Sequence, residues 1–234
     1  MRHVIPEVSV FNFMAGFVNV FLLETSDGLM LIDTGMSGNM MDTIAADLSK
    51  HGRSVEDIRH IFITHAHVDH IGGLAHMQTL TNAHTYAHRR EAAIIRGEAQ
   101  VQYARPEDLG FLGRTFGSRM LSTSPIPPAR VDSEVKEGDP ILDVFEVIEL
   151  PGHAYGHIGL LWPEKKVLFG GDTVFNLPWG FTKPLAPATP DMPEAIRSIK
   201  KAAALDIDTL CICHGSPVVE DTSAKLRKFA ARFN

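Results

Sequence analysis

The chain has 234 residues, of which 44% are hydrophobic and 21% charged, and its formal net charge is −6. This composition is that of one or two ordinary globular domains with a sizeable core. Because the chain contains no block of basic residues, it offers no electrostatic footprint for nucleic acid or for an anionic membrane surface. We therefore expect a small-molecule partner, with neither nucleic acid nor membrane as a partner.

The chain carries no targeting segment that we recognise. Residues 1–7 lack the apolar core of a signal peptide, and no segment approaches the roughly 20 apolar residues of a membrane span. Cys211 and Cys213 are two positions apart, so on a strand they point to the same face and do not readily form a disulfide. These features predict a cytoplasmic protein with buried free thiols, with metal ligation by Cys213 as the alternative.

The first half of the chain alternates strands with helices. Its predicted elements are strands at 18–24 and 28–33, a helix at 40–51, a strand at 58–63, a helix that begins at Gly72-Gly73 and a strand around 85–87. The turn at residues 26–28 makes the first two strands a hairpin. The helix at 40–51 is predicted from apolar residues at i, i+3, i+4 and i+7, and Gly52 ends it.

The second half repeats the alternation after a less regular, partly helical insertion at residues 89–130. Its predicted elements are strands at 140–150, 158–162 and 165–169, a loop containing Pro, Gly and Trp, a helix at 192–204, a strand at 208–213 and a final helix. This pattern favours two packed sheets with helices outside. We predict a single α/β domain over residues 1–234, a four-layer αββα sandwich of mixed sheets and outer helices.

Three imidazoles and a carboxylate directly follow the predicted strand at 58–63, in the run His65-Ala66-His67-Val68-Asp69-His70. Imidazole and carboxylate are ligands of a cation such as Zn²⁺, and a site without thiolate is more often catalytic than structural. His65 and His67 alternate like strand residues, while Asp69 and His70 are expected in the turn before the next helix. The four side chains can therefore surround two adjacent metal ions. A His-rich surface loop is the alternative interpretation.

Three further fragments each lie at the end of a predicted strand and supply another metal-type ligand. They are Pro151-Gly152-His153, Gly170-Gly171-Asp172-Thr173 and Cys213-His214-Gly215. Together with Asp33-Thr34-Gly35 and the histidine run, these motifs occur in an order that resembles the metallo-β-lactamase superfamily over residues 31–215. The resemblance implies that family's four-layer fold, with the insertion at 89–130 covering the site.

The resemblance also implies roles for individual residues. The implied metal ligands are His65, His67 and His153 for one ion, Asp69, His70 and His214 for the second, and Asp172 as the bridge between them. Asp33 matches the family's strand-end aspartate, which orients ligands, and His157 is expected to orient its loop through hydrogen bonds. Zinc is the expected metal, with iron and manganese as alternatives. Cys213 departs from the pattern, since many relatives carry glycine before the last histidine.

The expected chemistry follows from charge. Two divalent ions roughly 3.5–4 Å apart share a hydroxide at neutral pH, because metal binding lowers the pKa of water to about 7. One ion would polarise a carbonyl or phosphoryl oxygen, and the other would stabilise the leaving group. Asp69 is the candidate that holds the hydroxide and returns its proton, and Tyr155 is a candidate that offers its phenol to a substrate oxygen.

Aromatic and flexible apolar side chains occur in three segments, residues 11–17, the insertion at 89–130 and residues 175–181. If they face the site, they form a hydrophobic pocket suited to an acyl chain, a lactone or an aryl leaving group. The pocket candidates are Phe13, Met14, Phe17, Phe175, Trp179 and Phe181. The alternative is that they pack between loops and core. An exposed apolar insertion is equally a lid or a dimer contact, so a homodimer stays open.

The resemblance leaves several activities to choose from. Relatives of the glyoxalase II type usually add a helical C-terminal substrate domain, whereas the segment after Gly215 suffices for one helix, so we expect glutathione thioester hydrolysis less than ester or lactone hydrolysis. The acidic charge argues against RNA processing. We predict a binuclear metallohydrolase for carboxylic esters or lactones, with promiscuous phosphotriesterase activity. The alternatives are a β-lactamase or thioesterase, an iron-dependent dioxygenase and a non-catalytic metal-binding protein.

Overall fold

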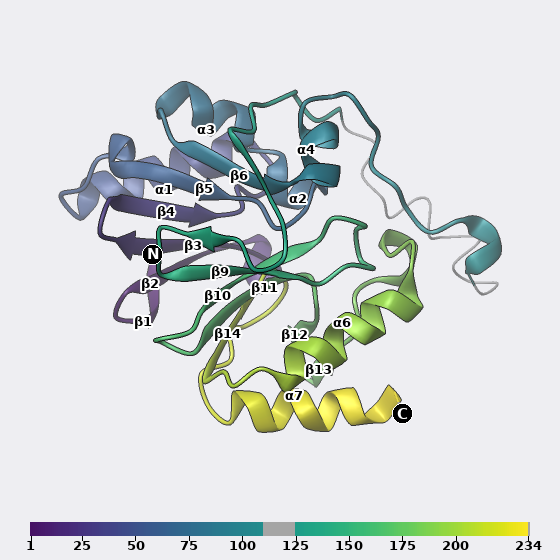
Figure 1. Ribbon diagram of the computed structural model, residues 1–234. Coiled ribbons are helices and arrows are strands. Elements are labelled where there is room, and N and C mark those ends of the chain that lie inside the picture. Colours follow the sequence, from purple (N-terminus) through teal and green to yellow (C-terminus); the bar gives the residue numbers. More distant parts are fainter. Residues whose placement is uncertain (110–124, 234) are drawn as a thin grey trace. The chain divides into compact units, whose positions relative to one another are not determined.

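The structure is a computed structural model that describes residues 1–109 and 125–233. The chain divides into two compact units, one formed by residues 1–99 and 126–135 and the other by residues 100–125 and 136–234. Each unit contains its own mixed sheet with helices (Figure 1). The middle of the predicted insertion at 89–130 lies outside the described residues, so its role as a cover stays a prediction.

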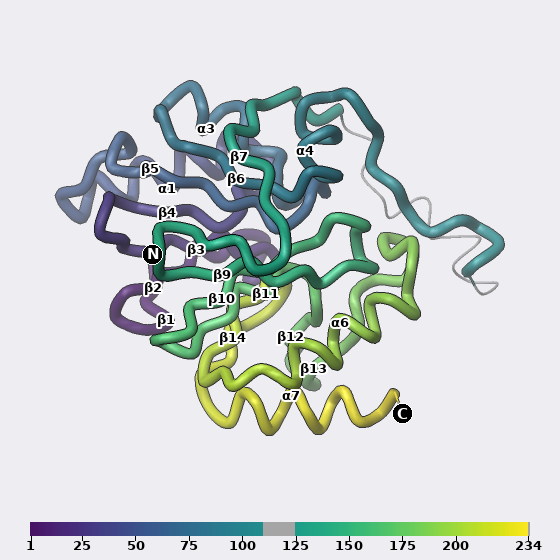
Figure 2. The backbone as a smooth tube through the Cα atoms, in the orientation of Figure 1, coloured from purple at the N-terminus to yellow at the C-terminus, as the bar shows by residue number. Residues whose placement is uncertain are grey.

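The described part of the first unit contains a seven-stranded sheet in the order β1 to β7. Its strands are β1 (Arg2–Ile5), β2 (Val8–Phe13), β3 (Val18–Thr25), β4 (Gly28–Ile32), β5 (Ile58–Phe62), β6 (His84–His88) and β7 (Ser133–Val135). Strands β1 to β4 pair antiparallel, whereas β4 to β7 pair parallel. Because β4 and β5 run in the same direction, the residues that follow them lie at the same edge of the sheet (Figure 2).

Helices of the first unit cover its apolar core. They are α1 (Gly38–Lys50), α2 (Val68–Ile71), α3 (Leu74–Leu80) and α4 (Arg89–Ile95), with short 3₁₀ turns η1 (Met14–Gly16) and η2 (Val55–Asp57). The predicted spacing on α1 is confirmed, because its buried residues Met41, Ile44 and Leu48 join a core with strand residues such as Leu31 and Ile61.

The helix predicted to begin at Gly72-Gly73 differs from the structure. Asp69 and His70 lie in the short helix α2 rather than in a turn, and α3 begins after the two glycines. A Cβ at Gly72 would lie 2.1 Å from the carbonyl oxygen of Met36, and one at Gly73 would lie 2.3 Å from that of Thr34. The glycines are thus needed for close packing against the segment after β4, and this packing separates α2 from α3.

The second unit contains a five-stranded sheet in the order β14-β11-β10-β9-β8 and a two-stranded ribbon, β12-β13, among its described residues. The strands are β8 (Pro140–Ile141), β9 (Phe145–Glu149), β10 (Ile158–Trp162), β11 (Val167–Gly171), β12 (Phe175–Leu177), β13 (Gly180–Thr182) and β14 (Thr209–Ile212). Only the β11–β14 pair is parallel among these pairs. The loop predicted after β11 is therefore partly wrong, because it contains the β12-β13 hairpin.

Two long helices pack on this sheet. The helical elements are α6 (Met192–Ala204), α7 (Thr222–Ala230) and the 3₁₀ turns η3 (Pro106–Asp108), η4 (Ala186–Ala188) and η5 (Ala231–Phe233). Ile199 of α6 and Leu226 of α7 join Leu168, Leu210 and Ile212 in one buried core. Within the described ranges, no helix is both long enough and apolar enough to cross a membrane.

Candidate metal centre

Three imidazoles of the first unit meet just beyond the carboxyl end of β5. His65, His67 and His70 are all buried. Nε2 of His65 lies 3.0 Å from Nδ1 of His67, and the rings of His65 and His70 are 3.9 Å apart between centroids. Neutral imidazoles in such a group have the protonation state that metal ligands require.

Asp33 fixes the orientation of His70. It follows β4 in a left-handed conformation, with a φ of 61°. One carboxylate oxygen accepts a hydrogen bond from the backbone N–H of Thr64 at 2.8 Å, and the other accepts one from Nδ1 of His70 at 2.7 Å. Because Nδ1 donates, the neutral His70 ring carries its lone pair on Nε2. Oδ2 of Asp69 lies 3.9 Å from that Nε2 atom.

A residue that sequence reasoning missed also supports the histidine run. Glu91, on α4, is buried, and its carboxylate accepts a hydrogen bond from the backbone N–H of Ala66 at 2.8 Å. Ala66 lies between His65 and His67, so this bond holds the segment that presents both imidazoles. No local signal separates Glu91 from a surface glutamate, because the contact spans 25 residues.

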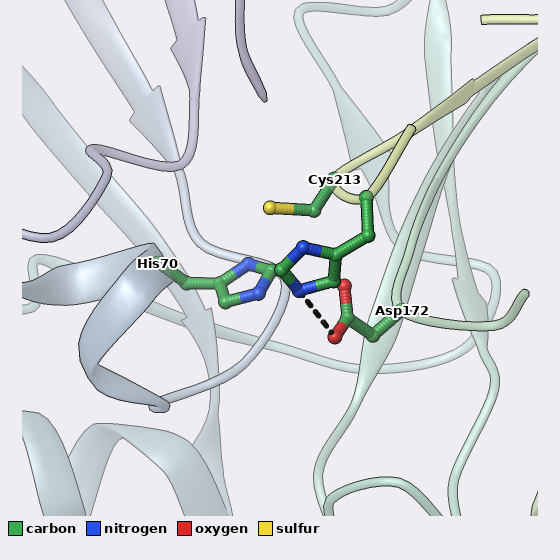
Figure 3. Close-up of side chains that lie close together, drawn as sticks. His70, Asp172 and Cys213 are labelled. Carbon is green, nitrogen blue, oxygen red and sulfur yellow. Dashed lines mark ion pairs between the residues drawn. The ribbon is translucent and has the colours of Figure 1, made fainter. Parts of the chain in front are cut away.

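In the second unit, two imidazoles meet one carboxylate. Asp172 follows β11, and its Oδ2 atom lies 3.2 Å from Nε2 of His153 and 3.1 Å from Nε2 of His214. All three side chains are buried. Figure 3 labels Asp172, and a dashed line there marks an ion pair of its carboxylate. One carboxylate oxygen is thus shared by two imidazole nitrogens that come from different strand ends.

Thr189, which sequence reasoning also missed, orients His153. The Thr189 hydroxyl donates a hydrogen bond to the carbonyl of Leu185 at 2.8 Å, and it lies 3.0 Å from Nδ1 of His153. Since the hydroxyl proton is used by Leu185, the hydroxyl oxygen accepts from Nδ1 of His153. Nε2 of His153 then carries the lone pair, and this is the atom beside Asp172.

His157 holds the backbone of this site rather than adding a ligand. Its Nδ1 atom donates to the carbonyl of Leu150 at 2.9 Å, and its Nε2 atom accepts from the backbone N–H of Asp172 at 3.0 Å. Both ring nitrogens are therefore engaged by protein backbone. The ring fixes Asp172 relative to the segment that follows β9.

His214 is fixed by the first residues of the β12-β13 hairpin. The ring of Phe175 packs edge-on against His214 at 4.4 Å between centroids, and the backbone N–H of Asn176 donates to the His214 carbonyl at 3.0 Å. Gly215 has a φ of 94°, and a Cβ there would lie 1.9 Å from the Asn176 carbonyl oxygen. A glycine is required after this histidine.

The predicted pocket and phenol candidates have different environments. Met14, Phe17, Tyr155 and Trp179 are exposed, and Trp179, near the tip of the β12-β13 hairpin, has 77% of its surface accessible. Phe175 is buried against His214, Phe181 packs on Phe229 of α7, and Phe13 packs against the core of the first unit. The exposed members are available to contact a ligand, whereas Phe175 and Phe181 have packing roles.

The donor atoms of both units fit divalent metal ions. Each cluster combines buried imidazole nitrogens with carboxylate oxygens, the ligand types of zinc and related first-row metals. The family model described as "Metallo-beta-lactamase superfamily" matches residues 14–214. The chain belongs to the metallo-β-lactamase superfamily. This match confirms the resemblance seen in the sequence. The clusters of imidazoles and carboxylates are consistent with the binding of divalent metal ions.

Several curated relatives are named as hydrolases. The probable metallo-hydrolase YflN of Bacillus subtilis is 27% identical over 86% of this chain and 81% of its own length. The acyl-coenzyme A thioesterase MBLAC2 of Gallus gallus is 33% identical over 48% of this chain and 40% of its own length. A hydroxyacylglutathione hydrolase of Rhodopseudomonas palustris is 29% identical over 58% of this chain and 41% of its own length. These similarities support a metal-dependent hydrolase.

Solved structures confirm the α/β metallo-β-lactamase fold. A metallo-β-lactamase family protein from Thermus thermophilus matches with a TM-score of 0.72 and 20% identity, over 99% of this chain and 80% of the other. The protein TTHA1623, solved in a di-iron-bound form, matches with a TM-score of 0.69 and 25% identity, over 94% of this chain and 99% of the other.

Proposed function

We propose that this chain hydrolyses small carboxylic esters or lactones with the help of two divalent metal ions, with zinc as the expected metal. The observation that carries the proposal is the position of Asp172, whose Oδ2 atom lies 3.2 Å from His153 and 3.1 Å from His214. An anionic oxygen between two imidazole nitrogens is the arrangement expected of a ligand shared by two cations. A structural ion pair would need only one of the two histidines.

The family resemblance supports a division of the ligands between the two ions. The proposed ligands are His65, His67 and His153 for one ion, Asp69, His70 and His214 for the other, and Asp172 for both. When bound, such a pair of ions activates water at neutral pH and polarises the carbonyl of the substrate. The buried imidazoles and the two carboxylates supply the donor atoms and the negative charge that this chemistry needs.

Asp69 is the proposed proton carrier. Its carboxylate lies beside Nε2 of His70 on the same helix, at 3.9 Å, and its side chain is partly exposed with 23% of its surface accessible. A carboxylate that touches both a ligand and solvent can take a proton from the attacking water and deliver it to the leaving group. Asp33 and His157 act on the proposed ligands through hydrogen bonds, Asp33 on the His70 ring and His157 on the Asp172 backbone.

The β12-β13 hairpin supports an acyl or lactone substrate over a highly charged one. Its first residues contact His214, and its tip presents the indole of Trp179 to solvent. An exposed indole close in sequence to metal-type ligands offers an apolar surface with one hydrogen-bond donor. Such a surface suits an acyl chain or a lactone ring better than a phosphorylated or polyanionic substrate.

Thioester hydrolysis is the second candidate. It is favoured by the similarity to an acyl-coenzyme A thioesterase and to a hydroxyacylglutathione hydrolase. The matched region spans about two fifths of the length of each of those relatives, so their activity comes to this chain only as a proposal. The same acyl-transfer chemistry serves both bond types, so the leaving group decides between them.

The test is metal content by elemental analysis on freshly purified protein, together with initial rates on lactones, aryl esters, thioesters, β-lactams and phosphotriesters. The proposal expects two metal ions per chain and the highest kcat/KM for a lactone or an ester. A dominant thioester rate would select the second candidate. Two metal ions without hydrolysis of any of these bonds would refute both candidates, and iron with oxygen consumption would indicate an oxygenase instead.

A further inference from the structure

Cys213 lies beside two of the proposed ligands of the second unit. It directly precedes His214 and is buried, with 2% of its surface accessible. Its Sγ atom lies within 4.8 Å of the ligand atoms of Asp172 and His214. Figure 3 draws Cys213 and Asp172, each of which directly follows the last residue of a paired strand, β14 and β11. A thiol is thus part of a cluster that also contains an imidazole and a carboxylate.

The backbone holds the thiol in this place. The N–H of Cys213 donates to the carbonyl of Gly171 at 3.1 Å, which ties it to the residue before Asp172. On the other side, Asn176 donates to the carbonyl of His214 and accepts from the N–H of Ser216. The bond to Gly171 continues the parallel β11–β14 pairing beyond the last residue of β14, and the bonds of Asn176 join the same segment to β12. The position of Cys213 is therefore built into the sheet rather than set by a mobile loop.

We propose that Cys213 is a ligand of the metal ion that Asp172 and His214 hold, which gives this ion a nitrogen, oxygen and sulfur donor set. The inference rests on the proposed function only in requiring that metal ions bind. At the tetrahedral angle usual for zinc, a sulfur about 2.3 Å and a nitrogen about 2.0 Å from the ion lie about 3.5 Å apart. An Sγ atom within 4.8 Å of the other donors therefore needs a shift of up to about 1.3 Å to bind with them.

A thiolate ligand has a chemical consequence for metal choice. Thiolate is a soft donor that favours zinc and cobalt, whereas a site made only of imidazole and carboxylate accepts manganese readily. We expect the ion at Asp172, Cys213 and His214 to be selective for zinc over manganese. Removal of the sulfur should reduce this selectivity.

Cys211 is the matched control. It occupies the same segment two residues earlier, is equally buried, and lies inside β14 opposite Phe169 of β11. Burial alone raises the pKa of the Cys211 thiol, as expected of an inert core residue. Substitution of Cys211 therefore reports the effect of losing a buried thiol that does not bind metal.

The experiment is X-ray absorption at the zinc edge on zinc-loaded protein, for the unmodified chain, Cys213→Ser and Cys211→Ser. The proposal expects a sulfur shell at about 2.3 Å in the unmodified chain and in Cys211→Ser, and its absence in Cys213→Ser. The cobalt-substituted unmodified protein should show a thiolate-to-cobalt charge-transfer band in the near ultraviolet, a readout that does not depend on a variant folding.

The outcomes separate this inference from the proposed function. Two zinc ions per chain with ester hydrolysis, but only nitrogen and oxygen around zinc and no charge-transfer band, would overturn the role of Cys213 and leave the proposed function intact. A sulfur shell without hydrolysis of any ester, lactone or thioester would support Cys213 as a ligand and reject the proposed function. A chain that binds no metal would overturn both.

Discussion

Asp33 and His70 form a buried pair in which Oδ2 of the aspartate accepts a hydrogen bond from Nδ1 of the imidazole at 2.7 Å. The same carboxylate accepts the backbone N–H of Thr64, so Asp33 connects the ends of two parallel strands to α2. This relationship sets both the tautomer and the orientation of a proposed metal ligand. It also explains why an aspartate occupies a left-handed position where most residues would be strained.

We predict that Asp33→Asn weakens metal binding while preserving the fold. Asparagine tolerates the left-handed backbone, and its amide oxygen can still accept one of the hydrogen bonds. The loss of the charge beside His70 should lower metal affinity by about 10–100-fold, as for other partners of ligating histidines. Titration against a zinc indicator measures the affinity. Asp27→Asn is the control, because Asp27 makes a similar contact with His60, at 3.1 Å, on the turn between β3 and β4. Equal affinities in the two variants would contradict the role of Asp33.

We predict that Asp172→Asn lowers the metal content of the purified protein below two ions per chain. The substitution keeps the shape of the side chain but removes the negative charge that faces both His153 and His214. Elemental analysis after dialysis measures the effect. Asp206→Asn in the same unit changes an exposed carboxylate that pairs with Lys166, and it should retain the full metal content. Unchanged metal content in Asp172→Asn would remove the central observation behind the proposed function.

We predict that His157→Phe destabilises the protein even when metal is removed. Phenylalanine fills the space but leaves the Leu150 carbonyl and the Asp172 N–H without the bonds that His157 makes. Each buried group that loses its partner costs about 1–3 kcal/mol. Urea unfolding in the presence of a chelator measures the free energy of unfolding. His51→Gln, at an exposed histidine, serves as the reference. Its urea midpoint should equal that of the unmodified chain within experimental error. A midpoint as high as that of the reference would mean that His157 does not hold this loop.

We predict an acid-sensitive contribution to stability from His60. Burial lowers the pKa of His60 from its ordinary value of 6.5, and the hydrogen bond to Asp27 only partly offsets this. Because the folded protein binds the proton less well than the unfolded chain, the contribution is present above pH 6.5 and is lost as the pH falls through the lowered pKa. Asp27→Asn removes the offsetting group, so its stability should fall more steeply on acidification.

The test compares urea midpoints at about pH 7.5 and about pH 5.5 for the unmodified chain, Asp27→Asn and His60→Gln. His60→Gln should show the smallest change between the two pH values, because it removes the titrating ring. The metal-type histidines are the same in all three proteins, so only the differences between proteins report on His60. If His60→Gln lost more stability on acidification than the unmodified chain, the predicted direction of the His60 effect would be wrong.

The sequence predicted the parts of this protein that depend on local periodicity and on motif order. The helix at Met192–Ala204 and the strand at Ile158–Trp162 have the bounds that the apolar pattern indicates, and both cysteines are buried and form no disulfide, as expected. The family resemblance also came from short motifs, because each candidate ligand at a strand end lies in a short run of consecutive residues. These features need no information about distant segments.

Only the tertiary structure decided which distant groups hold those motifs in place. Glu91, Thr189 and the backbone of Leu150 act on the histidines and on Asp172 from 7 to 36 residues away, so no local pattern marks them. The same applies to α2, which exists because Gly72 and Gly73 pack against the segment after β4, and to β12-β13, whose three-residue strands are stabilised by their pairing. Local sequence determines where a metal-type side chain occurs, whereas long-range hydrogen bonds and packing determine the direction in which it points.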